Sequence, residues 1–274
     1  MPLRRTDSRP LGCHREIAGR TPRFDGWTTP QMVRQPAPKT WKDSAMYKVT
    51  RLLHSADPSD EMTTAMIVKR LAAAAESTGA RRALAARTLP GVRNGGDVLV
   101  HLQFRDAAEW ARQREVVDEA CAEPAIGHID GVEYETAAGD RGGRRREAAP
   151  PGVYRTLLLR VDPAAGPGQV SRFEHGTLQM PVHIPAISAW QLSPVRHAVG
   201  TAQWTHVWEQ EFTDVDGLLG AYMRHPIHWA HVDRFFDPEC PEWIVKDRIC
   251  HSFCAISAPI IDTAPEIAPT ARES

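Results

Sequence analysis

Three histidines lie within seven residues of the segment HPIHWAH (residues 225–231), and Tyr222 precedes them. A neutral imidazole is a good general base near pH 7, and a phenol beside it can orient the imidazole or polarise a substrate carbonyl. Tyr222 and His228 are six residues apart across Pro226, which ends or kinks a helix, so both side chains are free to point the same way. The pair predicts proton abstraction next to a carbonyl group, with His228 as the base and Tyr222 as its partner or oxyanion donor.

A metal site is the alternative interpretation of the same histidines. On a straight helix, residues three apart are separated by about 60° and residues six apart by about 120°, so three ligands from HPIHWAH converge poorly. The spacing also differs from HExxH, and a carboxylate ligand, Glu209 or Asp214, is not specified by any pattern. We therefore expect no metal and no cofactor, and we expect His231 to be a surface or capping residue.

A second group of candidates follows from the predicted strand TAQWTHVWEQEF (residues 201–212). Side chains of a strand alternate between its faces, so one face is expected to carry Trp204, His206, Trp208, Gln210 and Phe212. Three aromatic rings and a histidine suit a pocket for a flat ligand, and they suit equally a hydrophobic core with His206 hydrogen-bonded between the rings. In the first interpretation His206 is a second acid/base group, Trp204 and Trp208 stack on the substrate, and His225 lies beside it.

The elements that position these residues occur twice in the chain. MYKVTRLL (46–53) corresponds to VYRTLLLR (153–160), with Tyr47 opposite Tyr154, and GGDVLVHLQFRDAAEW (95–110) corresponds to GTAQWTHVWEQEFTDVDGL (200–218). Each half has the order βαββαβ, which is the ferredoxin-like arrangement of a four-stranded antiparallel sheet covered by helices on one face. Two such sheets can cover each other, so the predicted fold class is α+β, with the two repeats packed sheet to sheet as an intramolecular dimeric α/β barrel.

The predicted boundaries follow from shifts in composition. The expected parts are an extended or disordered N-terminal arm (1–45), a first ferredoxin-like repeat (46–136), a linker (137–152), a second repeat (153–258) and a C-terminal tail (259–274). The linker contains the basic run RGGRRR (141–146), which we expect to be solvated.

The two halves differ in the residues that could do chemistry. The strand face of the first half that matches the histidine-bearing face carries only Val98, Val100, Leu102 and Phe104. In the following helix Ala120 stands opposite His228 and Arg114 opposite Tyr222. The first repeat is therefore expected to be structural and the second to bear the site.

Bulk properties exclude several classes of protein. The 274 residues are 42% hydrophobic with a formal net charge of -1, which is not the basic footprint of a nucleic-acid-binding protein. No apolar run approaches the roughly 20 residues of a membrane span, and no secretory signal is evident. Five scattered cysteines do not form a disulfide framework. We expect a cytoplasmic, reduced protein without nucleic-acid or membrane partners.

The motifs VYRTLLLR, WTHVWEQEF (204–212) and AYMRHPIH (221–228) make the second half resemble the stress-responsive dimeric α/β-barrel family, and in particular its polyketide cyclases that make olivetolic acid. The resemblance implies that Tyr222 and His228 form the acid/base pair of an aldol cyclisation and that His206 is a pocket histidine. Arg155 stands where the cyclases carry another pocket histidine. An arginine there implies an anionic or strongly polarised substrate group.

The leading functional hypothesis is a cofactor-independent acid/base enzyme, a lyase, isomerase or cyclase, acting on a small aromatic or carbonyl compound. One alternative is a haem- or oxygen-dependent, monooxygenase-like enzyme in which a histidine supplies an axial ligand. A second is a non-catalytic stress-responsive binding protein. The sequence is also compatible with a homodimer, because internal closure of the barrel still leaves strand edges and helical faces exposed.

Overall fold

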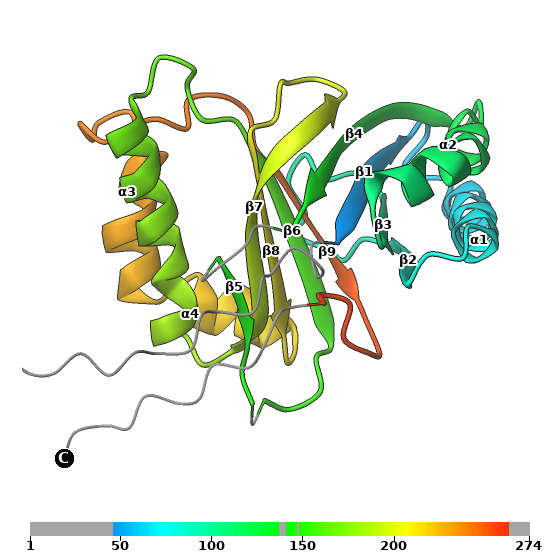
Figure 1. Cartoon of the computed structure of the whole chain (residues 1–274). Coiled ribbons are helices and arrows are strands. Elements are labelled where there is room, and N and C mark those ends of the chain that lie inside the picture. The colour runs from blue at the N-terminus through cyan, green and yellow to red at the C-terminus, as the bar shows by residue number, and fades with distance from the viewer. Residues whose placement is uncertain (1–45, 137–140, 147, 263–274) are drawn as a thin grey trace, which may run out of the picture. The chain divides into compact units, whose positions relative to one another are not determined.

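The computed structural model describes residues 46–136, 141–146 and 148–262, which belong to one compact unit (Figure 1). The predicted N-terminal arm and residues 263–274 of the predicted tail lie outside the described residues. Within the described part, no helix has the length and apolar character required to cross a membrane.

The first half forms a four-stranded antiparallel sheet with two helices on its outer face (Figure 1). Its elements are β1 (Tyr47–Ser55), α1 (Glu61–Ser77), β2 (Arg82–Arg87), β3 (Val98–Phe104), α2 (Ala107–Cys121) and β4 (Ile126–Glu135). The sheet order is β2-β3-β1-β4, as in a ferredoxin-like fold. Both helices begin at an aspartate N-cap, where Asp60 accepts from the Thr63 amide at 3.0 Å and Asp106 from the Glu109 amide at 2.8 Å.

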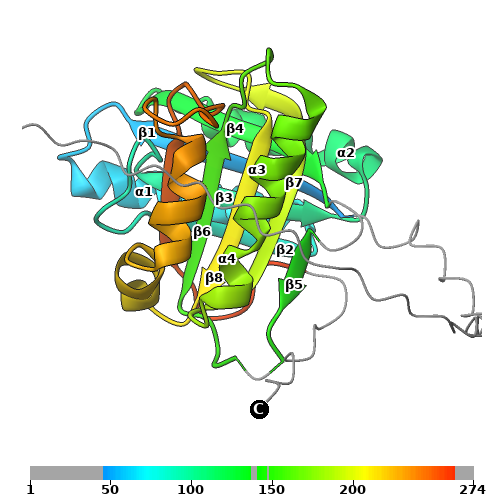
Figure 2. The ribbon, with the colours of Figure 1, turned by 90° about the vertical axis from the view of Figure 1, so that its left-hand side faces the viewer.

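The second half repeats this order with a less regular second helix. Its elements are β6 (Val153–Leu159), α3 (Pro167–Leu178), α4 (Met180–His183), β7 (Ile187–Val199), β8 (His206–Phe212), the π-helical turns η2 (Gly217–Tyr222) and η3 (Ile227–Val232), the 3₁₀ turn η4 (Asp233–Phe235) and β9 (Cys250–Ala255). The sheet order β7-β8-β6-β9 matches that of the first half. Figure 2 shows α3 and α4 in front of this sheet. The predicted ferredoxin-like order is thus confirmed in each half.

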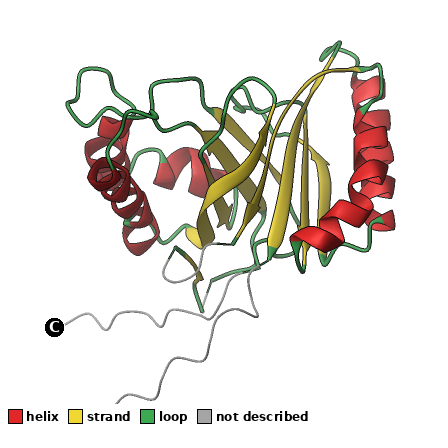
Figure 3. Cartoon of the chain, turned by 45° about the horizontal axis from the view of Figure 1, so that its top comes forward, coloured by secondary structure: helices red, strands yellow, loops and turns green. Residues whose placement is uncertain are grey.

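The two halves join through their strands. β4 pairs antiparallel with β7 from Gly131↔Val199 to Tyr134↔Val195, so the strands form one nine-stranded sheet that includes the short β5 (Gly142–Arg144). The opposite ends of the strand order approach at the isolated bridge Thr88↔Cys254. Helices lie on the two outer sides and strands between them (Figure 3). A hydrophobic cluster shared by both halves includes Leu52, Leu99, Val132, Tyr154, Leu158 and Val207.

The register corrects one detail of the predicted repeat. Tyr47 pairs with Phe104, whereas Val153 pairs with Phe212. Because the two phenylalanines correspond, Tyr47 corresponds to Val153, and its expected match with Tyr154 is wrong by one residue. The difference matters because a shift of one residue moves a side chain to the other face of a strand. Tyr47 packs in the cluster under the first-half helices, and Tyr154 packs in the shared cluster.

The basic run of the predicted linker is docked rather than solvated. β5 pairs with β7, Arg141 forms a two-pronged ion pair with Glu174 at 2.6 and 2.7 Å, and Arg144 lies 2.9 Å from Glu211. Glu211 is fully buried. The expectation was wrong because the acidic partners lie on other elements and only the folded sheet brings them to the arginines.

The first residues of the predicted tail are also docked. The amides of Ile260 and Ile261 both donate to Glu211 Oε1 at 2.6 Å, and both side chains are buried in the shared cluster. The packing of the second half therefore extends to Ile261, beyond the predicted boundary at residue 258.

Candidate functional site

A cavity of about 290 Å³ lies between the outer face of the second-half sheet and the helices that cover it. Its apolar wall comes from β6, β8, α3, α4 and η3. Six ionisable side chains contribute to its lining, namely Arg93, Arg155, Tyr222, His228, Asp233 and His251. The cavity therefore combines an apolar wall with a small convergent polar group, which is typical of a small-molecule site.

Tyr222 and His228 are in contact in this cavity. Tyr222 ends η2, and His228 is the second residue of η3, which follows Pro226. The ring centroids are 4.7 Å apart with an edge-to-face angle of 65°. The predicted break at Pro226 is confirmed, and it is what allows two residues six apart in sequence to meet. π-helical turns are uncommon and often occur at functional sites.

The imidazole of His228 also faces a carboxylate. Its Nδ1 lies 3.5 Å from Asp233 Oδ2, although without hydrogen-bond geometry. Asp233 opens the 3₁₀ turn that directly follows η3. A carboxylate at this nitrogen stabilises the imidazolium that forms when the opposite nitrogen accepts a proton.

Arg155 is a buried cation without a carboxylate partner among the described residues. Its guanidinium donates to Gln210 Oε1 and, at 3.3 Å, to the Tyr222 hydroxyl, and it lies 5.1 Å from the Tyr222 ring. Burial lowers the pKa of Arg155, while the same burial raises the pKa of Tyr222. A buried charge without a counter-ion is costly, so this arrangement suits an anionic ligand.

His251 is a cavity residue that the sequence did not reveal. It lies on β9 opposite Leu157 of β6, and its Nε2 is buried without a hydrogen-bond partner in the described part of the chain. Burial, together with Arg155 and His228, lowers the pKa of His251 to about 2. The imidazole is therefore neutral and offers the cavity a free polar atom. The only sequence signal was alternation in CHSFC, and only the pairing of β9 with β6 puts the residue beside Arg155.

Of the other sequence candidates, Trp208 lines the cavity and His206 does not. His206 Nδ1 is 2.8 Å from the hydroxyl of Thr205, and its Nε2 is 3.3 Å from Glu174 of α3. The ring also contacts Phe173 edge-to-face at 5.6 Å. His206 thus links β8 to α3.

Trp204 and His225 also lie away from the cavity. β8 begins only at His206, so the strand alternation does not extend back to Trp204, which packs in the cluster shared by both halves. His225 Nδ1 accepts from the amide of Ile227 at 3.2 Å at the start of η3. The structure therefore brings together Arg155, Trp208, Tyr222 and His228, and leaves out Trp204, His206 and His225.

The first half has no equivalent of this polar group at the corresponding strand positions. By the observed register, Val49 stands at the position of Arg155, Val100 at that of Trp208 and Leu102 at that of Gln210. These three side chains lie in or beside the cluster packed under α1 and α2. The predicted asymmetry between the β3 and β8 faces is confirmed.

The first half is not free of buried charge elsewhere. Arg51 and Arg114 pair with Glu133 at 2.7 and 2.6 Å, and Tyr47 donates to the same carboxylate at 2.9 Å. Here both guanidinium groups are paired with a carboxylate, in contrast to Arg155. The buried Arg51 of the first half therefore has a carboxylate partner, whereas the buried Arg155 of the second half has none among the described residues.

Comparisons with known proteins agree with this fold. Residues 153–250, in the second half of the chain, match the family described as the Stress responsive A/B Barrel Domain. No curated protein matches the chain.

Among solved structures, an anthrone oxidase-like protein is similar with a TM-score of 0.56 and 10% identity over 79% of this chain and 92% of that chain. A mutant chlorite dismutase from Candidatus Nitrospira defluvii has a TM-score of 0.46 and 9% identity over 77% and 92%. A dimeric ferredoxin-like protein of unknown function from Thermobifida fusca has a TM-score of 0.33 and 18% identity over 41% and 98%. At 10% identity, the similarity to the anthrone oxidase-like protein supports the fold across both halves and is no evidence of activity.

Proposed function

We propose that this protein is a cofactor-independent acid/base enzyme that acts on a small aromatic or carbonyl compound with an anionic group. The observation that carries the proposal is the group Arg155, Tyr222 and His228 in one cavity, with the rings of the last two 4.7 Å apart and no carboxylate on Arg155 among the described residues. Lyase, isomerase and cyclase reactions share the first step that this group supports.

In the proposed reaction, the anionic group of the substrate pairs with Arg155. The Tyr222 hydroxyl, held by the same guanidinium at 3.3 Å, donates to the substrate carbonyl oxygen and stabilises the charge that develops there. His228 removes the proton next to that carbonyl, and Asp233 at 3.5 Å stabilises the resulting imidazolium. Trp208 packs against the substrate ring, and His206 acts indirectly by holding α3 over the cavity.

The size of the cavity narrows the substrate class. About 290 Å³ lies at the lower end of small-molecule sites, which span roughly 300 to 1,000 Å³. A single ring with a short side chain fits this volume, and the free Nε2 of His251 supplies one further polar contact. We infer a monocyclic aromatic or β-keto acid.

We further propose that the two halves are repeats that close as an internal dimeric α/β barrel. The identical strand order of the halves, the β4–β7 pairing and the bridge between Thr88 and Cys254 support this arrangement. One repeat then carries the site, while the other supplies the facing sheet.

Oxidation of an aromatic substrate is the second candidate, because the solved structure with a TM-score of 0.56 is described as anthrone oxidase-like. The same base would start such a reaction, since proton removal activates a phenolic carbon. Oxygen consumption during turnover distinguishes the two candidates.

The test measures binding and turnover of aromatic acids, phenols and β-keto acids by wild type and His228→Ala. Trp208 lines the cavity, so saturable quenching of tryptophan fluorescence reports occupancy. We expect His228→Ala to lower kcat by about 100-fold or more while the ligand Kd changes little, as for loss of a general base. His231→Ala is the matched control, because His231 lies in the same turn but is exposed. Unchanged kcat in His228→Ala would refute the assignment.

A further inference from the structure

A second cluster of titratable side chains lies on the first half, away from the cavity described above. His54 of β1 and the residues His128 and Asp130 of β4 bring one ligand atom each to within 4.8 Å of one another. Asp130 Oδ2 is 3.2 Å from His128 Nε2 and 3.9 Å from His54 Nε2. With metal–ligand bonds of about 2.0 to 2.2 Å, tetrahedral zinc ligands are roughly 3.3 to 3.6 Å apart, so these separations are close to those of a zinc site.

The two imidazole nitrogens lack any other partner. His54 Nε2 and His128 Nε2 are both shielded from solvent and face Asp130, and neither makes a well-aligned hydrogen bond with any of the described residues. Buried polar atoms are almost always hydrogen-bonded, so two unpaired nitrogens aimed at one carboxylate oxygen require an explanation.

The carboxylate is oriented as a metal ligand is oriented in known sites. Asp130 Oδ1 accepts from the amide and hydroxyl of Thr201 at 2.8 and 2.7 Å, which leaves Oδ2 directed at the histidines. Cys250 of β9 donates its thiol to the same Oδ2 at 3.5 Å. Such outer contacts fix the geometry of a ligating carboxylate and tune the affinity for the metal.

We propose that His54, His128 and Asp130 bind a divalent transition metal ion, with Zn²⁺ as the best match, and leave a fourth coordination position for water or a ligand. Two imidazoles and one carboxylate suit Zn²⁺ and do not suit Mg²⁺ or Ca²⁺, which prefer oxygen ligands. Because the ligands come from adjacent strands, and Cys250 and Thr201 come from the other half, the ion also ties the two halves together.

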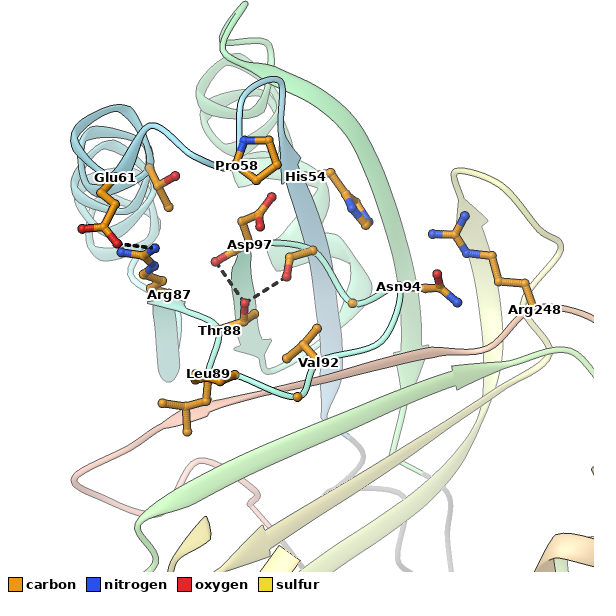
Figure 4. Close-up of a pocket in the computed structure, with 15 residues that line it drawn as sticks. His54, Pro58, Glu61, Arg87, Thr88, Leu89, Val92, Asn94, Asp97 and Arg248 are labelled. Atoms are coloured by element: carbon orange, nitrogen blue, oxygen red, sulfur yellow. Dashed lines mark hydrogen bonds and ion pairs between the residues drawn. The ribbon is translucent and has the colours of Figure 1, made fainter. Parts of the chain in front are cut away.

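The site has an entry path and a competing cation. His54 and Arg248 both line an open pocket of about 860 Å³, and Figure 4 shows their side chains approaching from opposite sides. Arg248 Nη2 lies 3.6 Å from Asp130 Oδ2. Its side chain is 39% exposed, so it can turn into solvent when an ion binds. The guanidinium thus places positive charge where the metal would otherwise supply it.

The first test measures Zn²⁺ binding by calorimetry to the tag-free, full-length chain after removal of metal with a chelator. We expect one tight site per chain, and affinity lower by about 100-fold or more in His54→Ala/His128→Ala. The control is His175→Ala/His183→Ala, which removes two exposed histidines of α3 and α4 and should keep wild-type affinity. The double variant also separates this site from Cys13 and His14, which lie outside the described residues.

Two further readouts protect the conclusion against a folding defect. Without metal, His54→Ala/His128→Ala should melt at the temperature of the wild type, and Zn²⁺ but not Mg²⁺ should raise the Tm of the wild type alone. Arg248→Ala should bind Zn²⁺ about tenfold more tightly, because it removes a competing cation next to Asp130. Equal Zn²⁺ affinity in the wild type and the double variant, or no binding by either, would overturn the proposal.

Discussion

At the scale of single residues, the distinctive feature is a buried charge that the fold does not neutralise. Arg51 and Lys48 are buried against Glu133 and Glu209, at 2.7 and 2.9 Å. Arg155 is equally buried, but among the described residues its guanidinium donates hydrogen bonds only to a neutral amide and a phenol. Such a residue lowers stability in the absence of ligand, and function is the usual reason for its retention.

Replacement of Arg155 should therefore separate stability from binding. We expect Arg155→Met to keep or raise the free energy of unfolding, because it removes a buried charge that has no carboxylate partner among the described residues. The affinity for anionic ligands should fall by about 50-fold, which corresponds to one charged hydrogen-bonded contact of roughly 2 to 3 kcal/mol. Urea unfolding and ligand titration measure the two effects. Arg160→Met is the control, because Arg160 directly follows β6, is partly exposed and pairs with Asp247. A loss of several kcal/mol in Arg155→Met would contradict the prediction.

The carboxylate next to His228 allows a second test. Asp233→Asn keeps the size of the side chain but removes the charge 3.5 Å from His228 Nδ1. We expect kcat to fall by about tenfold with little change in KM, because the carboxylate stabilises the imidazolium only after proton transfer. Steady-state kinetics would show this separation. A change confined to KM would indicate that Asp233 serves only in binding.

At the scale of elements, the turns decide where functional side chains lie. η2 and η3 flank Pro226 and bring Tyr222 to His228. The turn between β7 and β8 carries Thr201, whose amide donates a hydrogen bond to Asp130. Both placements depend on short irregular segments rather than on the regular strands and helices beside them.

Gly200 in this second turn has no room for a side chain. Its φ is +99°, and a Cβ would lie 2.4 Å from both Asp130 Oδ1 and the carbonyl oxygen of Ile129. Gly200→Ala should destabilise the protein by about 2 to 3 kcal/mol, because the backbone is strained and Asp130 must move. The control is Gly220→Ala in η2, where a Cβ meets nothing within 4 Å. Thermal melting should show the difference, and equal melting temperatures would contradict the prediction.

At the scale of the whole molecule, the halves are joined by a buried polar network as well as by strands. Lys48 of β1 pairs with Glu209 of β8 at 2.9 Å, and both side chains are fully buried. Tyr154 also donates to Glu209 at 3.0 Å, and His101 of β3 lies 3.1 Å from the Tyr154 hydroxyl. This network spans the interface that only the assembled halves create.

Replacing one member of the buried ion pair should lower the free energy of unfolding more than replacing both. We expect Lys48→Met to cost about 3 to 5 kcal/mol of the free energy of unfolding, because Glu209 stays buried without its cation. Lys48→Met/Glu209→Met should recover most of that loss, since well-packed apolar side chains often replace a buried ion pair without penalty. Urea unfolding of the single and double variants measures the coupling. Additive losses would show that the two charges act independently.

The same network predicts how stability depends on pH. Burial lowers the pKa of His101 to about 4 from the ordinary 6.5, although Glu209 opposes the shift. The folded protein therefore keeps His101 neutral, and below pH 6.5 the unfolded chain binds the proton more readily. The contribution of His101 to the free energy of unfolding is therefore complete above pH 6.5. It is lost as the pH falls toward 4, and the total loss is about 3 kcal/mol. The free energy of unfolding at pH 7.5 and pH 4.5 should differ less in His101→Gln than in the wild type.

Periodicity and local chemistry by themselves determined the order of elements. Strands, helices and the second-half family resemblance follow from alternation, helical spacing and motifs such as AYMRHPIH, and these are local properties of the chain. The meeting of Tyr222 with His228 was also foreseeable, because both sit on either side of one proline. The family resemblance makes Arg155 a candidate, but the sequence does not show that it lacks a carboxylate partner among the described residues.

The placement of several other side chains is decided only by the tertiary structure, because it depends on contacts between distant segments. His251 reaches the cavity through the pairing of β9 with β6, and the basic run 141–146 docks because Glu174 and Glu211 lie on other elements. His54 meets His128 and Asp130 because β1 and β4 are neighbours in the sheet although more than seventy residues separate them. Strand register, which a one-residue shift inverts, is set by the packing of whole faces, so no local pattern could have determined these sites.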